Sequence, residues 1–157
     1  MARMAVDIRS VLIPLTGQRV LLPNATDFAR IDVDVLEPGA AIPADRPRIV
    51  AAGRLAPEKR FDLLLDALAR VGGEREIELV ICGEGPQRAA LEAAARRLPA
   101  RIAVRMPGFV ANPFAWLASA DVFALSSDVE GLPNALIEAQ GLGLPAVATD
   151  CATGPSE

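Results

Sequence analysis

From residue 48 onward, short β-rich apolar runs alternate with segments of helical periodicity. The runs lie at 49–52, 77–82, 102–106, 122–125 and 146–149. Several of them are almost continuously apolar, which is typical of strands whose two faces are both covered by helices in a parallel sheet. This alternation constrains the fold more than any other feature, because repeated strand–helix–strand units build an α/β sheet.

Four helices are predicted between these strands. The first two are marked by apolar residues at helical spacing, namely Phe61, Leu64, Leu65, Leu68 and Val71, then Leu91, Ala94, Ala95 and Leu98. The other two are predicted at Pro113–Ala118 and Pro133–Leu142, each with proline near the first turn, where its missing N–H is not needed. We therefore predict a doubly wound α/β fold with a mostly parallel sheet and helices on both faces.

Composition excludes several classes of function. The net charge of −4 has the wrong sign for a protein that neutralises nucleic-acid phosphates. The chain has no histidine, which excludes imidazole general-base chemistry and histidine-ligated metals. Cys82 and Cys151 lack neighbours at metal-ligand spacing and are interpreted as small core residues. No apolar run reaches the roughly 18 residues of a membrane span, and the N-terminus lacks a signal-peptide core, so we predict a cytoplasmic location.

Ligands of open α/β sheets bind outside the carboxyl ends of the strands, so the loop after the first run is informative. It carries Arg54 and Lys59. If Pro57 opens the next helix, Lys59 lies in its first turn, where the helix dipole disfavours a cation unless an anion is bound. Arg54 and Lys59 would then clamp a diphosphate. The alternative is that both are solvated surface charges, with Lys59 paired to Glu58.

The loop after the 122–125 run is the richest in polar groups. It carries Glu130, and Glu138 follows eight residues later on the predicted helix. The two carboxylates would bracket a helix N-terminus and accept hydrogen bonds from sugar hydroxyls. The alternative is an exposed acidic loop followed by an ordinary helix glutamate.

Two further strand-end loops are weaker candidates. Gly83-Glu84-Gly85-Pro86 allows a tight turn and close approach of backbone to a ligand, but it lacks the third glycine of the dinucleotide fingerprint. A plain turn before a helix explains it equally well. The loop 107–110, Pro-Gly-Phe-Val, could receive a flat nucleobase or could pack in the core.

The motifs from about Val20 to the end resemble the C-terminal domain of family 4 glycosyltransferases, which have two facing Rossmann-like domains in the GT-B fold. The similar segments are PNATD, VAAGRLAPEKRFDLLLDAL, ELVICGEGP, PGFV, ADVFALSSDVEGLPNALIEAQGLGLPAVATD and GPSE. Two patterns are specific in order and spacing: G-R-x-x-x-x-K from Gly53 to Lys59, and two glutamates separated by seven residues, Glu130 and Glu138.

The resemblance implies a donor site for a nucleotide-diphospho-sugar. Arg54 and Lys59 would bind the diphosphate and offset charge on the leaving group, Glu130 would contact the sugar near its anomeric carbon, and Glu138 would hold the ribose. The catalytic set implied is Arg54, Lys59 and Glu130; the donor-binding set adds Gly108, Phe109, Val110, Gly131, Leu132, Pro133, Asn134 and Glu138. The family retains anomeric configuration and needs no cofactor or obligatory metal, and we interpret the triplet Asp32-Val33-Asp34, a metal motif in another fold, as incidental.

The same resemblance predicts the domain organisation. Residues 1–47 are predicted as a lead-in segment and interdomain linker, and residues 48–157 as the nucleotide-sugar-binding domain, truncated at its C-terminus. An N-terminal acceptor-binding domain would be missing, so the isolated chain is expected to bind donor but to transfer sugar poorly or not at all. Peripheral membrane association is an option for the full enzyme.

The resulting hypothesis is a retaining glycosyltransferase that uses a nucleotide-sugar, with UDP-sugars favoured, to modify a saccharide or lipid-linked acceptor in surface polysaccharide or glycoconjugate synthesis. Three alternatives remain open at this point. They are a GT-B nucleotide-sugar epimerase or phosphorylase, a non-catalytic nucleotide-sugar-binding module, and an α/β domain with no ligand.

Overall fold

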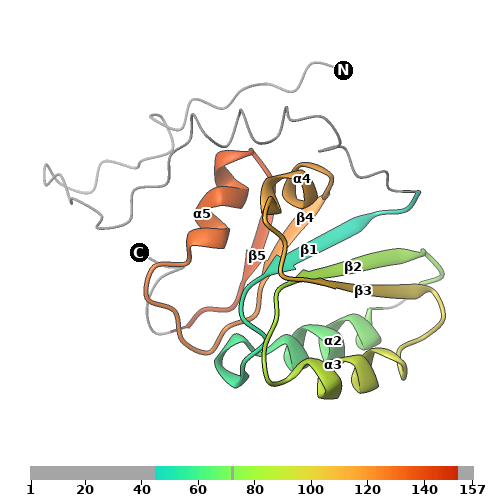
Figure 1. Ribbon diagram of the computed structural model, residues 1–157. Coiled ribbons are helices and arrows are strands. Elements are labelled where there is room, and N and C mark those ends of the chain that lie inside the picture. Colours follow the sequence, from blue (N-terminus) through green and yellow to red (C-terminus); the bar gives the residue numbers. More distant parts are fainter. Residues whose placement is uncertain (1–44, 72, 152–157) are drawn as a thin grey trace, which may run out of the picture.

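The computed structural model describes residues 45–71 and 73–151, which form one parallel sheet with helices on both faces (Figure 1). The sheet has five strands in the order β3-β2-β1-β4-β5. Their bounds are β1 Arg48–Ala52, β2 Ile77–Cys82, β3 Ile102–Gly108, β4 Val122–Leu125 and β5 Ala146–Ala148. Every strand pairing is parallel. The predicted fold class is confirmed, and each of the five apolar runs forms a strand.

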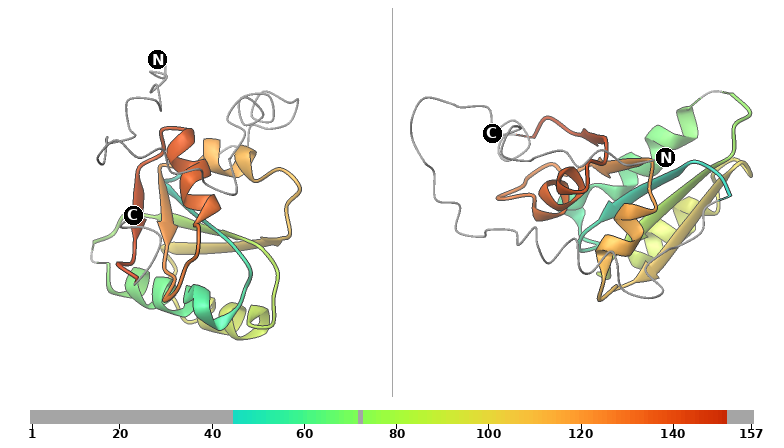
Figure 2. Two further views of the ribbon diagram at one scale, coloured as in Figure 1. Left: turned by 90° about the vertical axis from the view of Figure 1, so that its left-hand side faces the viewer. Right: turned by 90° about the horizontal axis from the view of Figure 1, so that it is seen from above.

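The helices form two layers, one on each side of the sheet (Figure 2). Helices α2 (Phe61–Arg70) and α3 (Arg88–Ala95) cover one face, and α4 (Pro113–Ala118) and α5 (Asn134–Gly141) lie on the other. On the first face Phe61, Leu65 and Leu68 of α2 are buried with residues of β1, β2 and β3. The periodicity of the sequence therefore identified the buried side of α2, except for Val71, which is the C-cap and is 42% exposed.

The strand order creates a switch point between β1 and β4. The chain runs outward from β1 through β2 to β3, then crosses to the other face through α4 and returns beside β1 as β4. Connections on opposite sides leave a crevice at the carboxyl ends of two such strands, which is where open α/β sheets bind ligands. The loops that follow β1 and β4 flank this point.

Strand β3 is longer than predicted, because Pro107 and Gly108 belong to the strand and not to the loop after it. Proline removes a ladder donor and is confined in sheets to edges and bulges. Since β3 is the edge strand, and its register with β2 shifts between Val80 and Cys82, Pro107 is accommodated there.

The start of α2 also differs from the prediction. Residues Pro57–Lys59 form a short 3-10 turn, η2, and α2 begins only at Phe61. Between them Arg60 adopts a left-handed backbone conformation, with φ of 46°. Lys59 therefore lies before the helix, and the expected penalty from a cation in the first turn of α2 does not apply. Pro133 likewise precedes α5 instead of occupying its first turn.

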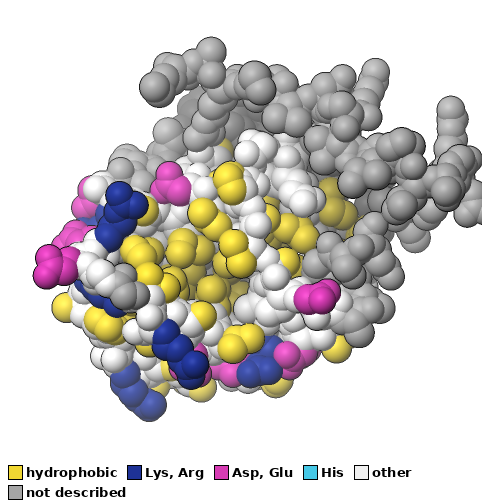
Figure 3. All heavy atoms as spheres, turned by 180° about the vertical axis from the view of Figure 1, so that it is seen from behind, with side chains coloured by type: hydrophobic (Ala, Val, Ile, Leu, Met, Phe, Trp, Pro, Cys, Tyr) yellow, Lys and Arg dark blue, Asp and Glu magenta, His cyan; other side chains and the backbone are white. Residues whose placement is uncertain are grey.

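Strand β5 is more exposed than its apolar sequence suggests. All three of its residues are exposed, with Val147 at 66%. β5 is the other edge strand of the sheet, and among the strands only β1, β2 and β3 contribute to the buried cluster beneath α2 and α3. Figure 3 shows hydrophobic side chains gathered on the face of the molecule opposite to that of Figure 1.

Candidate functional site

The loops after β1 and β4 are joined at the switch point by backbone contacts. The Asp128 N–H donates to the carbonyl of Glu58 at 2.9 Å, and the Ser126 hydroxyl donates to the carbonyl of Lys59 at 2.8 Å. Residues about 70 positions apart in sequence thus form one surface beside the carboxyl ends of β1 and β4. This is where the fold places the candidate site.

Lys59 and Glu130 meet across this junction. The Lys59 Nζ lies 2.7 Å from the Glu130 Oε1, and the same carboxylate oxygen accepts a hydrogen bond from the Ser127 hydroxyl. The Glu130 side chain is 6% exposed, whereas that of Lys59 is 24% exposed. The pairing of Lys59 with Glu58 and the exposed position of Glu130, both kept as alternatives, are therefore wrong. A buried anion is held against a cation that solvent can still reach.

Ser127 is itself held in place from β5. The Thr149 hydroxyl, just beyond the end of β5, donates to the Ser127 carbonyl, while the Ser127 side chain is fully buried. The sequence contained these residues in strand-end loops, but their types gave no signal of this role. Serine and threonine occur in every loop, so only the register of β4 with β5 shows that they support Glu130.

Arg54 lies two residues beyond β1 and is exposed. Within residues 45–71 and 73–151 its side chain makes no ion pair, in contrast to Lys59. A solvated surface charge and a cation awaiting an anion both fit this placement. Arg54 therefore remains a predicted ligand of the diphosphate.

The glycines of the predicted Gly83-Glu84-Gly85 turn serve contacts between backbones. A Cβ added at Gly83 would lie 1.9 Å from the Gly53 carbonyl oxygen, and one at Gly85 would lie 2.4 Å from that of Leu55. The Leu55 N–H donates to the Glu84 carbonyl, and the Gly83 N–H donates to that of Gly108. The loop after β2 therefore packs against the loop after β1 and against the end of β3, which supports the structural interpretation of this turn.

The predicted base-binding segment divides into three different environments. Gly108 ends β3 and packs against the Glu84 carboxylate, and Val110 packs against the core on the side of α4 and α5. Phe109 between them is 81% exposed. Core packing is thus the better interpretation of Val110, while Phe109 presents an aromatic ring to solvent.

Glu138 lies on α5, whose N-terminus follows the Glu130 loop directly. In this stretch Gly131 and Asn134 are exposed, Leu132 is half-buried and Pro133 is buried. The start of α5 has no side-chain cap among the described residues. Backbone carbonyls take that role instead, because the Asn134 N–H donates to the Leu132 carbonyl and the Leu136 N–H donates to the Pro133 carbonyl. Burial raises the pKa of the half-buried Glu138 carboxyl. A ligand that donates hydrogen bonds to this carboxylate would offset its desolvation.

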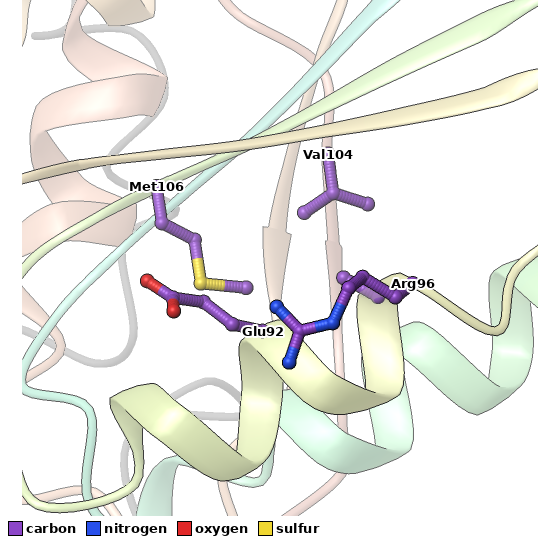
Figure 4. Close-up of a pocket in the computed structure, with 5 residues that line it drawn as sticks. Glu92, Arg96, Val104 and Met106 are labelled. Atoms are coloured by element: carbon purple, nitrogen blue, oxygen red, sulfur yellow. The ribbon is translucent and has the colours of Figure 1, made fainter.

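A pocket of about 310 Å³ lies elsewhere on the molecule (Figure 4). It is lined by Glu92 and Arg96 from α3 and its C-cap, and by Val104 and Met106 from β3, with Ala95 between them. Its position beside the edge strand is away from the switch point. It brings together none of the predicted site residues.

The remaining predictions concern metal binding, the cysteines and membrane spans. Among the described residues no cluster of acidic, cysteine or histidine side chains could hold a metal ion, and the Asp32-Val33-Asp34 triplet lies outside them. Burial raises the pKa of Cys82 to about 12, so this thiol stays protonated in the core. Across the part of the chain that the structure describes, no helix is long and apolar enough to cross a membrane. The lead-in segment falls outside these residues up to position 44.

Comparisons with known proteins agree on one class, the glycosyltransferases with a GT-B fold. The chain belongs to the family Glycosyl transferases group 1, whose sequence profile matches residues 46–157. The predicted resemblance is thereby confirmed.

Two relatives and one solved structure illustrate the similarity. An N-acetylgalactosaminyltransferase of Campylobacter jejuni, named for a diphospho-undecaprenol acceptor, is 34% identical, with 87% of this chain and 36% of the relative aligned. A GDP-mannose-dependent mannosyltransferase of Mycobacterium tuberculosis is 39% identical over 64% of this chain and 26% of its own length. Anabaena Alr3699/HepE, solved with UDP-glucose, is 26% identical, with a TM-score of 0.62 over 83% of this chain and 36% of that one. The chain thus spans about a quarter to a third of such relatives.

Proposed function

We propose that this chain binds the nucleotide-diphospho-sugar donor of a retaining glycosyltransferase at the switch point between β1 and β4, with UDP-sugars favoured. The observation that carries the proposal is the pairing of the half-accessible Lys59 ammonium with the buried Glu130 carboxylate at that point. In Anabaena HepE, a protein of the same fold, UDP-glucose is bound, which supports this choice of donor.

The cations serve the leaving group. During transfer the bond from the anomeric carbon to the diphosphate oxygen breaks, and a bond to an acceptor hydroxyl oxygen forms on the same face of the sugar. The hydroxyl proton departs with the nucleoside diphosphate. Lys59 and Arg54 stabilise the charge that develops on the diphosphate, so catalysis depends on fixed charges and positioning and uses neither a metal nor a cofactor.

The identity of the cation at position 59 supports this role. Lys59 is the single lysine among 16 basic residues, the other 15 being arginines. A lysine ammonium is a compact point charge, whereas an arginine guanidinium is a planar fork that spans two acceptors. In a chain that otherwise uses arginine, a lysine stands where a small cation must contact Glu130 and a phosphate together.

The carboxylates and the loop around them bind the sugar and nucleoside. Glu130, with backbone groups from Gly131 to Asn134, contacts the transferred sugar beside the N-terminus of α5. Glu138 accepts hydrogen bonds from the ribose hydroxyls. Phe109 stacks on the base, with Gly108 and Val110 supporting it from the strand end and the core.

For the acceptor we propose only a chemical class. The Campylobacter relative is named for a lipid-linked saccharide, so a saccharide or lipid-linked acceptor in surface polysaccharide or glycoconjugate synthesis is the class proposed here. Such a reaction would take place in the cytoplasm, beside the membrane that holds the acceptor. The residues named above are proposed to bind the donor and not the acceptor.

The test is calorimetric titration of the folded chain with UDP, UDP-sugars, GDP and GDP-sugars, in EDTA and in Mg²⁺. We expect UDP compounds to bind without metal, and Lys59→Met to weaken binding at least roughly tenfold, which is about 1.4 kcal/mol. Arg96→Met, which removes an exposed cation from the pocket beside β3, is the matched control and should bind like the parent. Absence of binding to a folded chain, or equal losses in both variants, would refute the donor site; tighter binding of GDP would refute the choice of base.

A further inference from the structure

Arg60 adopts a backbone conformation that glycine takes more readily than any other residue. Its φ of 46° is the one positive value at a non-glycine position among the described residues. A Cβ in this region is crowded by the neighbouring backbone, so the surrounding structure must hold the residue there. The side chain of Arg60 shows what this conformation achieves.

The Arg60 guanidinium joins two acidic residues. Its Nη1 lies 3.0 Å from both oxygens of Asp128, and its Nε lies 3.1 Å from Asp62 Oδ1. Asp62 is two residues further along the same segment, whereas Asp128 lies 68 positions away in the loop after β4. The contact with Asp128 therefore connects the two loops of the donor site, and the contact with Asp62 is local.

Three consecutive residues contact the loop after β4 in this way. The Glu58 carbonyl accepts from the Asp128 N–H, the Lys59 carbonyl accepts from the Ser126 hydroxyl, and the Arg60 side chain binds the Asp128 carboxylate. The Lys59 side chain then reaches Glu130 two residues beyond Asp128. Because these contacts fix the backbone on both sides, they set where the ammonium lies.

We propose that the Arg60–Asp128 ion pair is a positioning contact, which clasps the loops after β1 and β4 together and so holds the Lys59 ammonium against Glu130. This rests on the proposed function as far as the donor is concerned: a nucleoside diphosphate would meet a cation already placed for it. The Arg60 and Asp128 side chains themselves are 35% and 55% exposed, whereas the Glu130 side chain is 6% exposed.

The competing explanation is a surface ion pair that only adds a little to stability, as many exposed pairs do. Three variants separate the two. Arg60→Gly removes the guanidinium but suits the left-handed backbone, so the fold should be kept. Asp128→Asn removes the charge on the far side of the clasp without changing its backbone. Asp62→Asn is the matched control, because it weakens a contact of the same guanidinium that does not join the loops.

The first readout does not depend on the donor. Since Lys59 is the only lysine, its acylation by an amine-reactive ester can be followed by peptide mass mapping without interference from other side-chain amines. We expect Arg60→Gly and Asp128→Asn to raise the acylation rate roughly two- to fivefold, in the range of an exposed ion pair. Asp62→Asn should leave it unchanged. Unchanged rates in the first two variants, or the same increase in all three, would overturn the positioning role.

The second readout is affinity for UDP at low and high salt. Arg60→Gly and Asp128→Asn should bind UDP roughly two- to fivefold more weakly than the parent at low salt, with a smaller difference at high salt because salt screens the exposed pair. If the parent binds no UDP but the two variants still raise the Lys59 acylation rate, the proposed function is wrong and the positioning role of the Arg60–Asp128 pair is supported. If the parent binds UDP and neither variant changes the UDP affinity or the acylation rate, the positioning role is wrong and the proposed function is supported.

Discussion

The two ends of the parallel sheet each hold an ion pair between residues far apart in sequence, and the two pairs differ in how they are closed. At the amino end the Arg48 Nε lies 2.6 Å from Glu78 Oε2, with the side chains 1% and 5% exposed. At the carboxyl end the Lys59 Nζ lies 2.7 Å from Glu130 Oε1, but Lys59 is 24% exposed. One cation is sealed in the protein, and the other is open on one side.

The partners explain the difference. The amino-end pair is enclosed by further contacts of Arg48 or Glu78 to Arg105, Trp116, Ser119 and Asp121. The Arg48 guanidinium donates to both Glu78 and the Ser119 hydroxyl, which suits a joint between strands and the end of α4. The carboxyl-end pair holds its anion as firmly but leaves the ammonium reachable. The amino-end pair is therefore closed within the fold, whereas the carboxyl-end pair keeps one side of its cation open, as the proposed donor would require.

The largest effect is expected at the amino end. Glu78→Gln removes the carboxylate from a buried guanidinium, which should lower the free energy of unfolding by about 3 kcal/mol, as when one partner of a buried pair is removed. Urea denaturation measures this loss. Glu130→Gln should cost only about 1 kcal/mol, because Lys59 can turn toward water. Equal losses in the two variants would break the distinction between a closed and an open pair.

The glycine contacts between strand-end loops should give the next largest effect. In Gly85→Ala the new Cβ would lie 2.4 Å from the Leu55 carbonyl oxygen, so the loops after β1 and β2 must separate. Overpacking of this kind typically costs about 2 kcal/mol. Gly131→Ala, where the added Cβ meets no atom within 4 Å, is the control and should unfold like the parent. A stable Gly85→Ala variant would show that the loops near the site are more adaptable than their packing indicates.

Replacing Lys59 by arginine tests whether the ion pair at the carboxyl end of the sheet requires a compact cation. Lys59→Arg keeps the charge but replaces a compact ammonium by a larger fork beside buried Glu130. We expect stability to change by less than about 0.5 kcal/mol, since the side chain can extend into solvent, while UDP affinity falls roughly fivefold, or about 1 kcal/mol. Parallel denaturation and calorimetry provide the two values. Undiminished affinity would show that any cation suffices at this position.

Much of the fold, and the edge of the sheet where Lys59 and Glu130 lie, could be predicted from the sequence, because both depend on local patterns. Apolar runs mark buried strands, and residues that follow such runs must lie at the carboxyl edge of a parallel sheet. This reasoning placed Lys59 and Glu130 at the same edge, and the structure brings them into contact.

The details that the sequence could not supply depend on register and neighbours. Nothing local in the sequence indicates that Gly83 and Gly85 oppose the backbone of Gly53 and Leu55, because this follows from how β1 and β2 align. The left-handed conformation of Arg60 was also missed, since arginine is a good helix former and its partner Asp128 lies 68 residues away. The apolar sequence of β5 likewise does not indicate that all three of its residues are exposed.

The smallest effect is expected for Glu138, and it tests whether this residue binds the ribose of the donor at the carboxyl end of the sheet. Burial raises the pKa of this carboxyl, so between the usual glutamate value and the raised one the folded chain binds more protons than the unfolded chain. The contribution of Glu138 to stability is therefore present at low pH and is lost as pH rises through the raised pKa.

Ribose hydroxyls that donate to the ionised Glu138 carboxylate would oppose this rise in pKa. UDP binding should therefore release a fraction of a proton at pH values between the usual glutamate pKa and the raised one. Calorimetry in buffers of different ionisation enthalpy measures that release, which Glu138→Gln should abolish while also flattening the loss of stability with pH. Equal proton release in parent and variant would remove Glu138 from the ribose site and leave its raised pKa as a consequence of packing on α5 alone.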